Sequence, residues 1–312
     1  MENKILGLHH ITAIAGDVQR NYDFYTKILG LRMVKKTVNF DDPQTYHFYF
    51  GDEVGSPGTI LTFFPWPGAR PGQDGAGMAT EIGYWVPKGS LEFWKDRFEE
   101  KNIRHFQIRE RFGERQLPFL DPDGLKLTLI EAAHSDDRNG YETELIPSQN
   151  VIKGFHAVTL TLNFIEETAE VLTEIFGYKK IKTEGSFYRY GTDAVENAAF
   201  VDIFILPDAY RGINSKGTNH HVAFRVKNEE DLMTMRAKVL EKGLQITEKI
   251  DRNYFYSLYF REPGGVLFEI ATDNPGFAID ETVEELGNNL VLPARYEAAR
   301  AQIERALPQL KH

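Results

Sequence analysis

The first part of the chain alternates between strand-like and helix-like patterns of hydrophobic residues. Residues 7–14 form an apolar run typical of a buried strand, and residues 18–29 carry apolar side chains at helical spacing before Gly30. Glycine commonly ends helices because it adopts the left-handed conformation without strain. Residues 45–50 and 59–64 are rich in aromatic and β-branched residues, which predicts two further strands.

The same order of elements returns about 146 residues later, which indicates an internal repeat. Residues 154–160 repeat the first strand, and residues 165–176 repeat the first helix, which again ends at a glycine, Gly177. Strand-like runs then follow at 186–190 and 198–206.

A second kind of unit follows each of these two, again with a strand, a helix and later strands. Its predicted strand, helix and last strand are 81–86, 91–101 and 125–130 in the first copy, and 221–226, 229–242 and 266–271 in the second. In both copies a glycine-containing turn precedes the last strand, at 122–124 or 263–265. The chain therefore consists of four modules of one strand, one helix and about three strands, a βαβββ order that predicts an α+β fold.

Four modules in 312 residues predict two domains, since one domain typically holds about 100–200 residues. We expect an N-terminal pair of modules in 1–145, a C-terminal pair in 150–275 and a helical tail in 276–312. The polar segments 132–150 and 272–280 are expected to be connections. The apolar residues of the tail predict a docking stripe, formed by Ala298, Ala301, Ile303, Ala306 and Leu307.

The composition is that of an ordinary globular enzyme, with 42% hydrophobic and 26% charged residues. The 36 basic and 46 acidic residues give a net charge of −10, which argues against a nucleic-acid or anionic-membrane partner. No signal peptide and no apolar run of about 20 residues is apparent, so we expect a cytoplasmic protein, which could form a homo-oligomer. The absence of Cys excludes thiolate metal ligands, so a metal must be held by N and O atoms.

Aligning the four modules superimposes residues that carry chemistry. His10 aligns with His156, Glu81 with His221, and Thr128 with Glu269. Glu269 is an isolated carboxylate in an apolar strand, and an unpaired buried charge costs several kcal/mol, so it requires a proton, a cation or a metal. Thr128 is neutral, which indicates one working site and one decayed copy.

Two imidazoles and one carboxylate with open coordination positions suit non-haem Fe(II), which activates O₂. His221 and Glu269 are two of these ligands. The residues alone leave His10 and His156 as competing candidates for the third.

Three segments of the chain, 8–12, 217–224 and 262–269, resemble sequence motifs of the vicinal oxygen chelate superfamily. Within it, the chain resembles the ring-cleaving dioxygenases that act on hydroquinones, including the chlorohydroquinone dioxygenase group. The resemblance covers nearly the whole chain, including 38–43, 63–66 and 292–296.

This resemblance implies a fold of two domains with curved mixed sheets. It also implies that module one pairs with module four, so that His10, His221 and Glu269 hold the iron. Five further residues are implied to surround the metal or the substrate: His9, Thr12, His220, Arg252 and Tyr259. In the commoner arrangement of the superfamily adjacent modules pair, and His156 would replace His10; the doublets of adjacent histidines favour the first arrangement.

Simpler interpretations exist for most of the surrounding residues. Arg252 could pair with a surface carboxylate, and Tyr259 and Trp66 could be packing residues. His9 and His220 lie one residue from the ligands, so in straight strands they would face the opposite side unless a twist or bulge intervenes.

The sequence thus predicts an Fe(II)-dependent dioxygenase that uses O₂ to cleave a small hydroquinone-type aromatic ring. A histidine with a near-neutral pKa would take the phenol proton, and Arg252 and Tyr259 would stabilise developing charge. One alternative is an extradiol catechol dioxygenase. Another is a glyoxalase-type isomerase, which would normally need a fourth protein ligand. A metal-free binding protein would need neither Glu269 nor the histidines.

Overall fold

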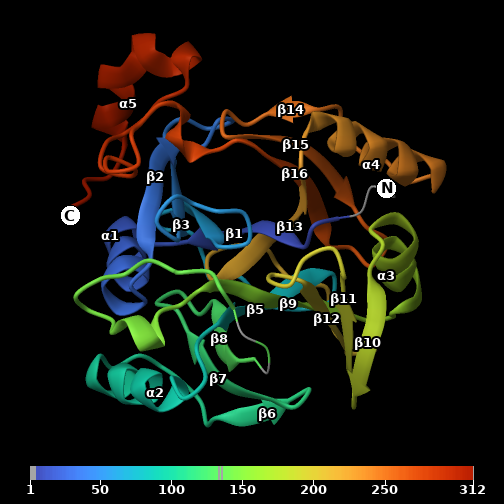
Figure 1. The fold of residues 1–312 in the computed structure, drawn as a ribbon. Helices are drawn as coiled ribbons and strands as arrows, with labels where there is room; N and C mark the ends of the chain where they lie inside the picture. The colour runs from blue at the N-terminus through green and yellow to red at the C-terminus, as the bar shows by residue number, and fades with distance from the viewer. Residues whose placement is uncertain (1–4, 133, 135, 312) are drawn as a thin grey trace.

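The computed structural model describes residues 5–132, 134 and 136–311, which form four successive strand–helix–three-strand modules (Figure 1). Module one contains β1 (Leu8–Ala15), α1 (Val18–Asp23) with its π-helical turn η1 (Phe24–Ile28), β2 (Arg32–Val38), β3 (Tyr46–Gly51) and β4 (Ile60–Pro65). Module two contains β5 (Met78–Trp85), α2 (Leu91–Glu100), β6 (Arg109–Arg111), β7 (Glu114–Leu120) and β8 (Lys126–Glu131). The βαβββ order predicted from the sequence is confirmed.

The second half of the chain repeats this order after a short 3₁₀ turn, η2 (Ser148–Asn150). Module three contains β9 (Gly154–Leu162), α3 (Glu166–Glu170) with its π-helical turn η3 (Val171–Ile175), β10 (Lys179–Glu184), β11 (Phe187–Gly191) and β12 (Phe200–Ile205). Module four contains β13 (Thr218–Val226), α4 (Glu229–Glu241), β14 (Ile250–Asp251), β15 (Phe255–Arg261) and β16 (Leu267–Pro275).

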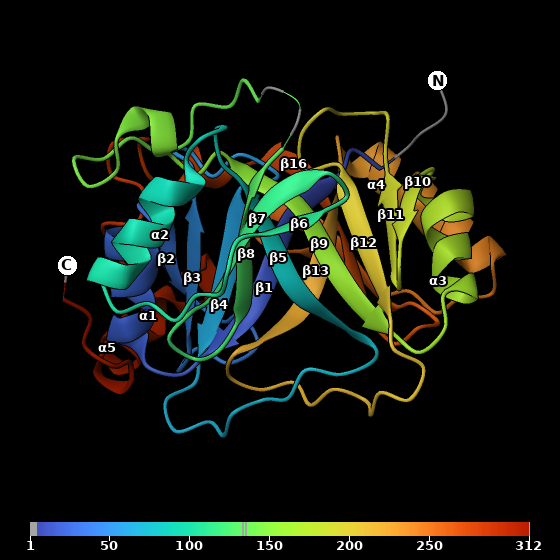
Figure 2. The same cartoon turned by 90° about the horizontal axis from the view of Figure 1, so that it is seen from below.

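The strands form two curved mixed sheets of eight strands each, and the helices lie on their outer sides (Figures 1 and 2). The first sheet has the order β14-β15-β16-β13-β1-β4-β3-β2 and joins modules one and four. The second has the order β10-β11-β12-β9-β5-β8-β7-β6 and joins modules two and three. The repeat in the sequence divides the chain into two halves at about residue 150. Each sheet, however, combines one module from each half of the chain.

Two β-bulges interrupt the pairing of β1 with β13. The register shifts by one residue between Leu8 and His10, which makes His9 the extra residue on β1. A second shift makes His220 the extra residue on β13. A bulge breaks the strict alternation of side chains between the two faces of a strand, so neighbouring histidines no longer have to point to opposite faces.

The second sheet carries the same two bulges, in β9 at His156 and in β5 at Thr80. His156 is therefore the structural counterpart of His9, and Ala157 is that of His10. The superposition of His10 on His156 predicted from the sequence is wrong by one residue. The other two superpositions, Glu81 with His221 and Thr128 with Glu269, agree with the strand register.

Six strands were not located individually from the sequence: β2, β6, β7, β10, β14 and β15. All six residues of β10 are exposed, so this edge strand has no apolar pattern. In β2 the polar side chain of Lys35 is buried, with its Nζ 2.6 Å from both Asp280 Oδ1 and Glu281 Oε2. A buried lysine in an ion-pair network is indistinguishable in sequence from a solvated one.

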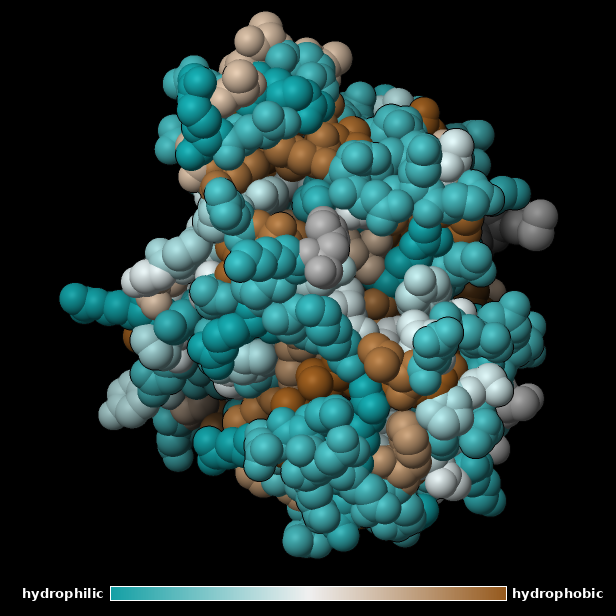
Figure 3. Space-filling model, turned by 90° about the vertical axis from the view of Figure 1, so that its left-hand side faces the viewer, coloured by the Kyte–Doolittle hydropathy of each residue, from teal (hydrophilic) through white to brown (hydrophobic). Residues whose placement is uncertain are grey.

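The C-terminal segment also differs from the prediction. Residues 272–275 belong to β16 and are not a connection, and three short helices follow: η4 (Phe277–Ile279), η5 (Ala294–Ala299) and α5 (Arg300–Ala306). Only Ile303 and Leu307 of the expected docking stripe are buried, whereas its three alanines are exposed. The 3₁₀ helix η5 has about three residues per turn, so an α-helical stripe cannot continue through it. Figure 3 shows the outer surface of this tail, at the top, as mainly hydrophilic.

In the described part of the chain, no helix is both long enough and apolar enough to cross a membrane.

Asp121, at the turn between β7 and β8, is hydrogen-bonded to Tyr25 of η1, and its buried carboxyl makes this contact testable through the pH dependence of stability. Its Oδ1 accepts hydrogen bonds from the backbone N–H groups of Asp123 and Leu125, both at 2.8 Å, and its Oδ2 accepts one from the Tyr25 hydroxyl at 3.1 Å. Burial raises the pKa of Asp121 from 3.8 to about 6. The folded state therefore favours the protonated carboxyl, and this contribution to stability is present below the lower pKa and lost as the pH rises through about 6.

We expect Asp121→Asn to remove this pH dependence. A shift of about two pKa units corresponds to about 3 kcal/mol. Relative to the Asn variant, the free energy of unfolding of the wild type is therefore expected to fall by about 2–3 kcal/mol between pH 4 and pH 7. Urea unfolding of both proteins at the two pH values measures this difference, and an unchanged difference would contradict the assignment.

Candidate metal centre

His10, His221 and Glu269 converge at the centre of the first sheet, on the adjacent strands β1, β13 and β16. The Nε2 atom of His221 lies 2.8 Å from Glu269 Oε2, and the Nε2 atom of His10 lies 3.2 Å from the same oxygen. All three residues are buried, and their ligand atoms lie within 4.8 Å of one another. The pairing of module one with module four is what brings His10 beside the other two.

The contacts of His9 determine which nitrogen of His10 is available to a metal. His9 Nε2 lies 3.1 Å from the carbonyl oxygen of Thr272, which can only accept, so this nitrogen carries the proton. Burial, reinforced by His10, holds the pKa of His9 well below its usual value, so the ring is neutral and its Nδ1 is an acceptor. The Nδ1 atoms of His9 and His10 are 2.9 Å apart, so His10 donates from Nδ1 to His9, and its Nε2 is directed at Glu269.

The second doublet repeats this arrangement. His220 Nδ1 lies 2.7 Å from His221 Nδ1, which again leaves Nε2 of the second histidine directed at Glu269. Burial and the neighbouring His221 lower the pKa of His220 to about 3, and burial also lowers the pKa of His221. Neutral imidazoles are the form that binds metals, so each bulge histidine holds its neighbour in a metal-binding tautomer.

Glu269 has a fully buried carboxylate. Its Oε1 accepts a hydrogen bond from the Ser257 hydroxyl on β15, which orients the group. Burial alone would raise its pKa, but His10 and His221 hold the pKa well below its ordinary value. Among the described residues, Glu269 Oε2 and His221 Nε2 have no partner with hydrogen-bond geometry despite their close approach.

The Nε2 atoms of His10 and His221 thus meet Glu269 Oε2 at contact distance, which requires a proton or a metal ion between them. Two histidines and one carboxylate, each already oriented by a second hydrogen-bonding partner, fit a divalent first-row transition metal.

His156, the competing ligand candidate, lies in the other sheet. Its Nε2 is 2.9 Å from Glu114 Oε1, and Glu114 Oε2 accepts from Arg189 Nη1 at 2.6 Å. Arg189 also binds Asp202 through two nitrogens, at 2.7 and 2.8 Å. His156 is therefore part of a buried ion-pair network and does not approach the three converging residues.

A cavity of about 240 Å³ opens beside the candidate ligands His10 and His221. Four of the five other residues expected at the site line it: Thr12, His220, Arg252 and Tyr259. The fifth, His9, lies behind His10 and lines a different hollow, near Phe255 and Phe277.

Arg252 reaches the cavity from the end of β14 and is close to both a carboxylate and a ring. Its Nη1 lies 3.4 Å from Asp41 Oδ2, and its guanidinium carbon lies 5.3 Å from the centre of the Tyr259 ring. Its buried Nε has no hydrogen-bond partner in the described part of the chain. Arg252 therefore forms the expected ion pair, yet retains a donor for a further group.

Sequence reasoning missed His47 and Tyr49 on β3, which also line the cavity. A hydrogen-bonded chain connects Thr12 to Thr62 at 2.9 Å, Thr62 to His47 Nε2 at 2.9 Å, and His47 Nδ1 to the Tyr49 hydroxyl at 2.9 Å. The only available signal was a histidine within a predicted strand, and that is too common to be informative.

Trp66, interpreted above as a packing residue, packs against a neighbouring ring and also lines the cavity. Its ring stacks on Phe64, with centroids 6.4 Å apart and an interplanar angle of 14°, and both residues line the cavity. The partly buried rings of Phe64 and Trp66 thus line the cavity together with polar groups of β3 and with Arg252.

The family model described as Glyoxalase/Bleomycin resistance protein/Dioxygenase superfamily matches residues 7–129 and 154–270. MhqO of Bacillus subtilis (strain 168), named as a proposed ring-cleaving dioxygenase, is 47% identical over 307 residues, covering 98% of this chain and 97% of MhqO. The chlorohydroquinone/hydroquinone 1,2-dioxygenase of Sphingobium indicum is 34% identical over 315 residues, covering 98% of this chain and 97% of that protein.

Solved structures show the same fold. The crystal structure of a proposed dioxygenase from Bacillus subtilis subsp. subtilis str. 168 is 45% identical and superimposes with a TM-score of 0.94, covering 99% of this chain and 98% of that one. Glyoxalase I from Zea mays, at 13% identity, superimposes with a TM-score of 0.64 over 86% of this chain and 92% of its own. The latter likeness concerns the fold alone.

Proposed function

Because this chain belongs to the Glyoxalase/Bleomycin resistance protein/Dioxygenase superfamily, we propose that it is an Fe(II)-dependent dioxygenase that cleaves the ring of a hydroquinone-type substrate. The observation that carries this proposal is the convergence of two buried histidines and one fully buried glutamate beside an aromatic-lined cavity. Relatives named as ring-cleaving dioxygenases, one of them for hydroquinones, support the choice of reaction.

His10, His221 and Glu269 would hold the metal, and the three-member set leaves coordination positions for other ligands. Bound Fe(II) supplies the Lewis acidity and the one-electron chemistry that allow a phenol to react with O₂. The chain itself orients both imidazoles through His9 and His220, and it fixes the carboxylate through Ser257.

The cavity is small enough to select a single aromatic ring. Its volume of about 240 Å³ is below the usual range of drug-sized pockets, about 300–1,000 Å³. Phe64, Trp66 and Phe255 provide flat apolar surfaces for such a ring. Burial of these surfaces also keeps bulk water away from the reacting carbon atoms.

The polar groups of the cavity would recognise the hydroxyl that points away from the metal. The hydroxyls of a hydroquinone are para to each other, so only one of them can approach the ligands. The other would meet the far side of the cavity, where Arg252 has a free Nε donor and where the His47–Tyr49 pair lies. A site built to hydrogen-bond a hydroxyl rejects rings that lack it.

His47 and His220 of the cavity would act as neutral hydrogen-bonding groups and not as bases. The near-neutral pKa expected from the sequence is not found, because burial lowers the pKa of His220 to about 3 and that of His47 well below its usual value. His220 accepts at Nδ1 from His221, so its Nε2–H remains to donate a hydrogen bond to a phenol oxygen and hold it in place.

We expect kcat/KM for a substituted hydroquinone to exceed that for catechol, and we expect Arg252→Ala or Tyr259→Phe to reduce this ratio by about tenfold or more. The measurement is O₂ uptake after anaerobic reconstitution with Fe(II). Arg236→Ala is the control, since Arg236 lies on the outer helix α4 and binds the carbonyl oxygen of Thr247. Catechol cleavage without O₂ uptake on any hydroquinone would instead establish the extradiol alternative.

A further inference from the structure

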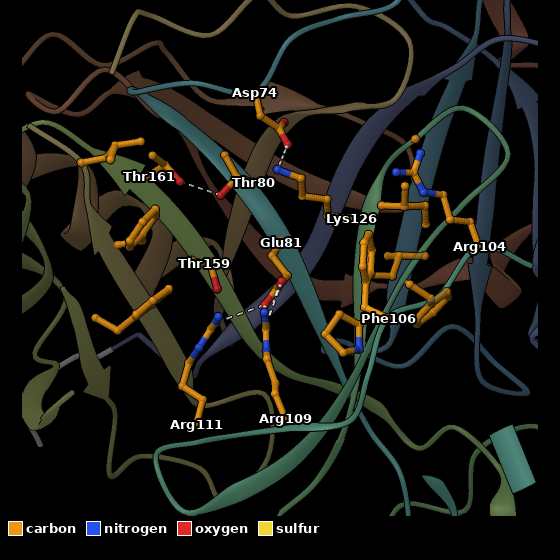
Figure 4. Close-up of a pocket in the computed structure, with 18 of the residues that line it drawn as sticks. Asp74, Thr80, Glu81, Arg104, Phe106, Arg109, Arg111, Lys126, Thr159 and Thr161 are labelled. Carbon is orange, nitrogen blue, oxygen red and sulfur yellow. Dashed lines mark hydrogen bonds and ion pairs between the residues drawn. The ribbon is translucent and has the colours of Figure 1, made fainter. Parts of the chain in front are cut away.

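The second sheet encloses a cavity of about 730 Å³, roughly three times the volume of the cavity beside the histidines (Figure 4). It lies at the corresponding place in the other pair of modules. Equivalent positions in the strand register line the two cavities: Thr159 corresponds to Thr12, Phe204 to Phe64 and Arg111 to Arg252. The repeat has therefore kept a pocket in both sheets.

The metal-binding positions have not been kept in this second cavity. Ala157 occupies the position of His10, Thr128 that of Glu269, and Glu81 that of His221. Figure 4 shows Glu81 at the centre of the cavity, facing Arg109 and Arg111 of β6. The second cavity therefore presents arginine side chains and lacks the set of metal ligands found in the first.

Two guanidinium groups share this one carboxylate. Arg109 Nη2 lies 2.7 and 3.0 Å from the two Glu81 oxygens, and Arg111 Nη1 lies 3.2 Å from Oε1. Arg109 Nε donates to Gln116 at 3.2 Å, but Arg109 Nη1 and Arg111 Nε and Nη2 make no hydrogen bond to any described residue. One positive charge and three donor nitrogens thus have no protein partner at the cavity, where the Arg109 side chain is 34% and the Arg111 side chain 10% exposed.

The rest of the cavity adds to this positive charge. Arg104 lies on its wall beside Phe106 and forms no ion pair within the described residues, whereas Lys126 is neutralised by Asp74 at 2.8 Å. The cavity as a whole has four basic and two acidic residues, an excess of two positive charges in a chain whose net charge is −10. Burial lowers the pKa of Arg111, and the nearby carboxylates Glu81 and Asp202 only partly offset this effect.

Aromatic side chains complete the walls beside these donors. The rings of Phe187 and Phe204 are stacked with centroids 4.5 Å apart and an interplanar angle of 16°. The Arg111 guanidinium carbon lies 3.8 Å from the centre of the Phe187 ring. Phe106 is 46% exposed at the cavity, and the Arg104 guanidinium carbon lies 5.8 Å from the centre of its ring.

We propose that this second cavity binds a conjugated carboxylate, a flat unsaturated or aromatic acid whose anionic end meets Arg109 and Arg111 and whose body lies against Phe106 and Phe187. Arginine is the side chain best suited to a carboxylate, since its planar fork can donate two parallel hydrogen bonds. A flat unsaturated body suits the aromatic walls for the same reason that aromatic rings stack.

The ring-opened product of the proposed reaction belongs to this class of ligand. Ring cleavage breaks the bond between a hydroxyl-bearing carbon and its neighbour and adds one oxygen atom of O₂ to each. The hydroxyl-bearing carbon becomes a carboxylate and the neighbour a carbonyl, while conjugation remains. This link to the product rests on the proposed function, whereas the binding site itself does not depend on it.

Calorimetric titration of the full-length protein with cinnamate, a flat conjugated acid, tests the site. Cinnamamide is the matched ligand because it has the same shape without the charge, and it is expected to bind about tenfold more weakly or not at all. Arg111→Gln is expected to weaken cinnamate binding by about tenfold or more, while Glu81 keeps its pair with Arg109. Phe106→Glu, an exposed change that leaves the core intact, is expected to do the same.

Arg252→Gln is the control, because Arg252 has the corresponding position in the first cavity. Cinnamate affinity within about twofold of the wild type in this variant supports binding in the second sheet. Loss of binding in Arg252→Gln would place the acid in the first cavity and overturn the proposal. Equal affinity for cinnamate and cinnamamide, or unchanged affinity in both Arg111→Gln and Phe106→Glu, would overturn it as well.

Discussion

Glu269→Gln is expected to abolish O₂ uptake and to lower the affinity for Fe(II) by about 100-fold or more. Removal of a residue that only supports a metal ligand typically costs 10–100-fold, so loss of the one anionic ligand should reach or exceed the upper end. Gln has nearly the same shape and can still accept a hydrogen bond from Ser257, so the fold should be retained. Circular dichroism checks the fold, and iron titration measures the affinity.

Glu262→Gln is the matched control for this variant. Glu262 is also a buried glutamate of module four, but it accepts hydrogen bonds from Thr168 and from the backbone of the turn before β16. We expect iron affinity within about twofold of the wild type in Glu262→Gln. Near-normal iron binding in Glu269→Gln itself would remove this carboxylate from the ligand set.

The modular architecture could be predicted from the sequence because the repeat is visible as a pattern. The glycines after both first helices, Gly30 and Gly177, have φ angles of 70° and 77°, a conformation that few other residues adopt easily. Their equal spacing from the preceding strands marks the same unit twice. The lone Glu269 in an apolar strand was also visible, since a buried charge is an unusual feature at any position.

Strand register could not be predicted, because a bulge leaves no signature in a short apolar strand. Sequence alignment placed His10 on His156, whereas the bulge at His9 makes His9 its true counterpart. A shift of one residue moves a side chain to the other face of a strand. The one-residue error therefore put His156, and not Ala157, at the position of the candidate ligand His10.

The pairing of module one with module four is likewise a long-range feature. It requires contact between β1 and β13, about 200 residues apart, and residue patterns within either strand do not encode that choice. The family resemblance and the two doublets of adjacent histidines favoured it. Residues such as Ser257 and His47 became recognisable through their contacts with Glu269 and Tyr49, and those contacts depend on the same pairing.

The three histidines His9, His10 and His156 should therefore respond differently to replacement by Ala. His10→Ala removes a candidate ligand, and we expect it to abolish iron binding and turnover. His9→Ala removes only the acceptor that fixes the tautomer of His10, so iron affinity should fall by about 10–100-fold.

His156→Ala should leave iron affinity and turnover unchanged and should affect stability instead. Glu114 loses one partner but keeps Arg189 at 2.6 Å, so a loss of about 1–3 kcal/mol in the free energy of unfolding is expected. Iron titration and urea unfolding of the three variants, measured side by side, distinguish these effects. Loss of iron in His156→Ala with normal iron binding in His10→Ala would show that adjacent modules pair in solution, and it would overturn the metal centre described above.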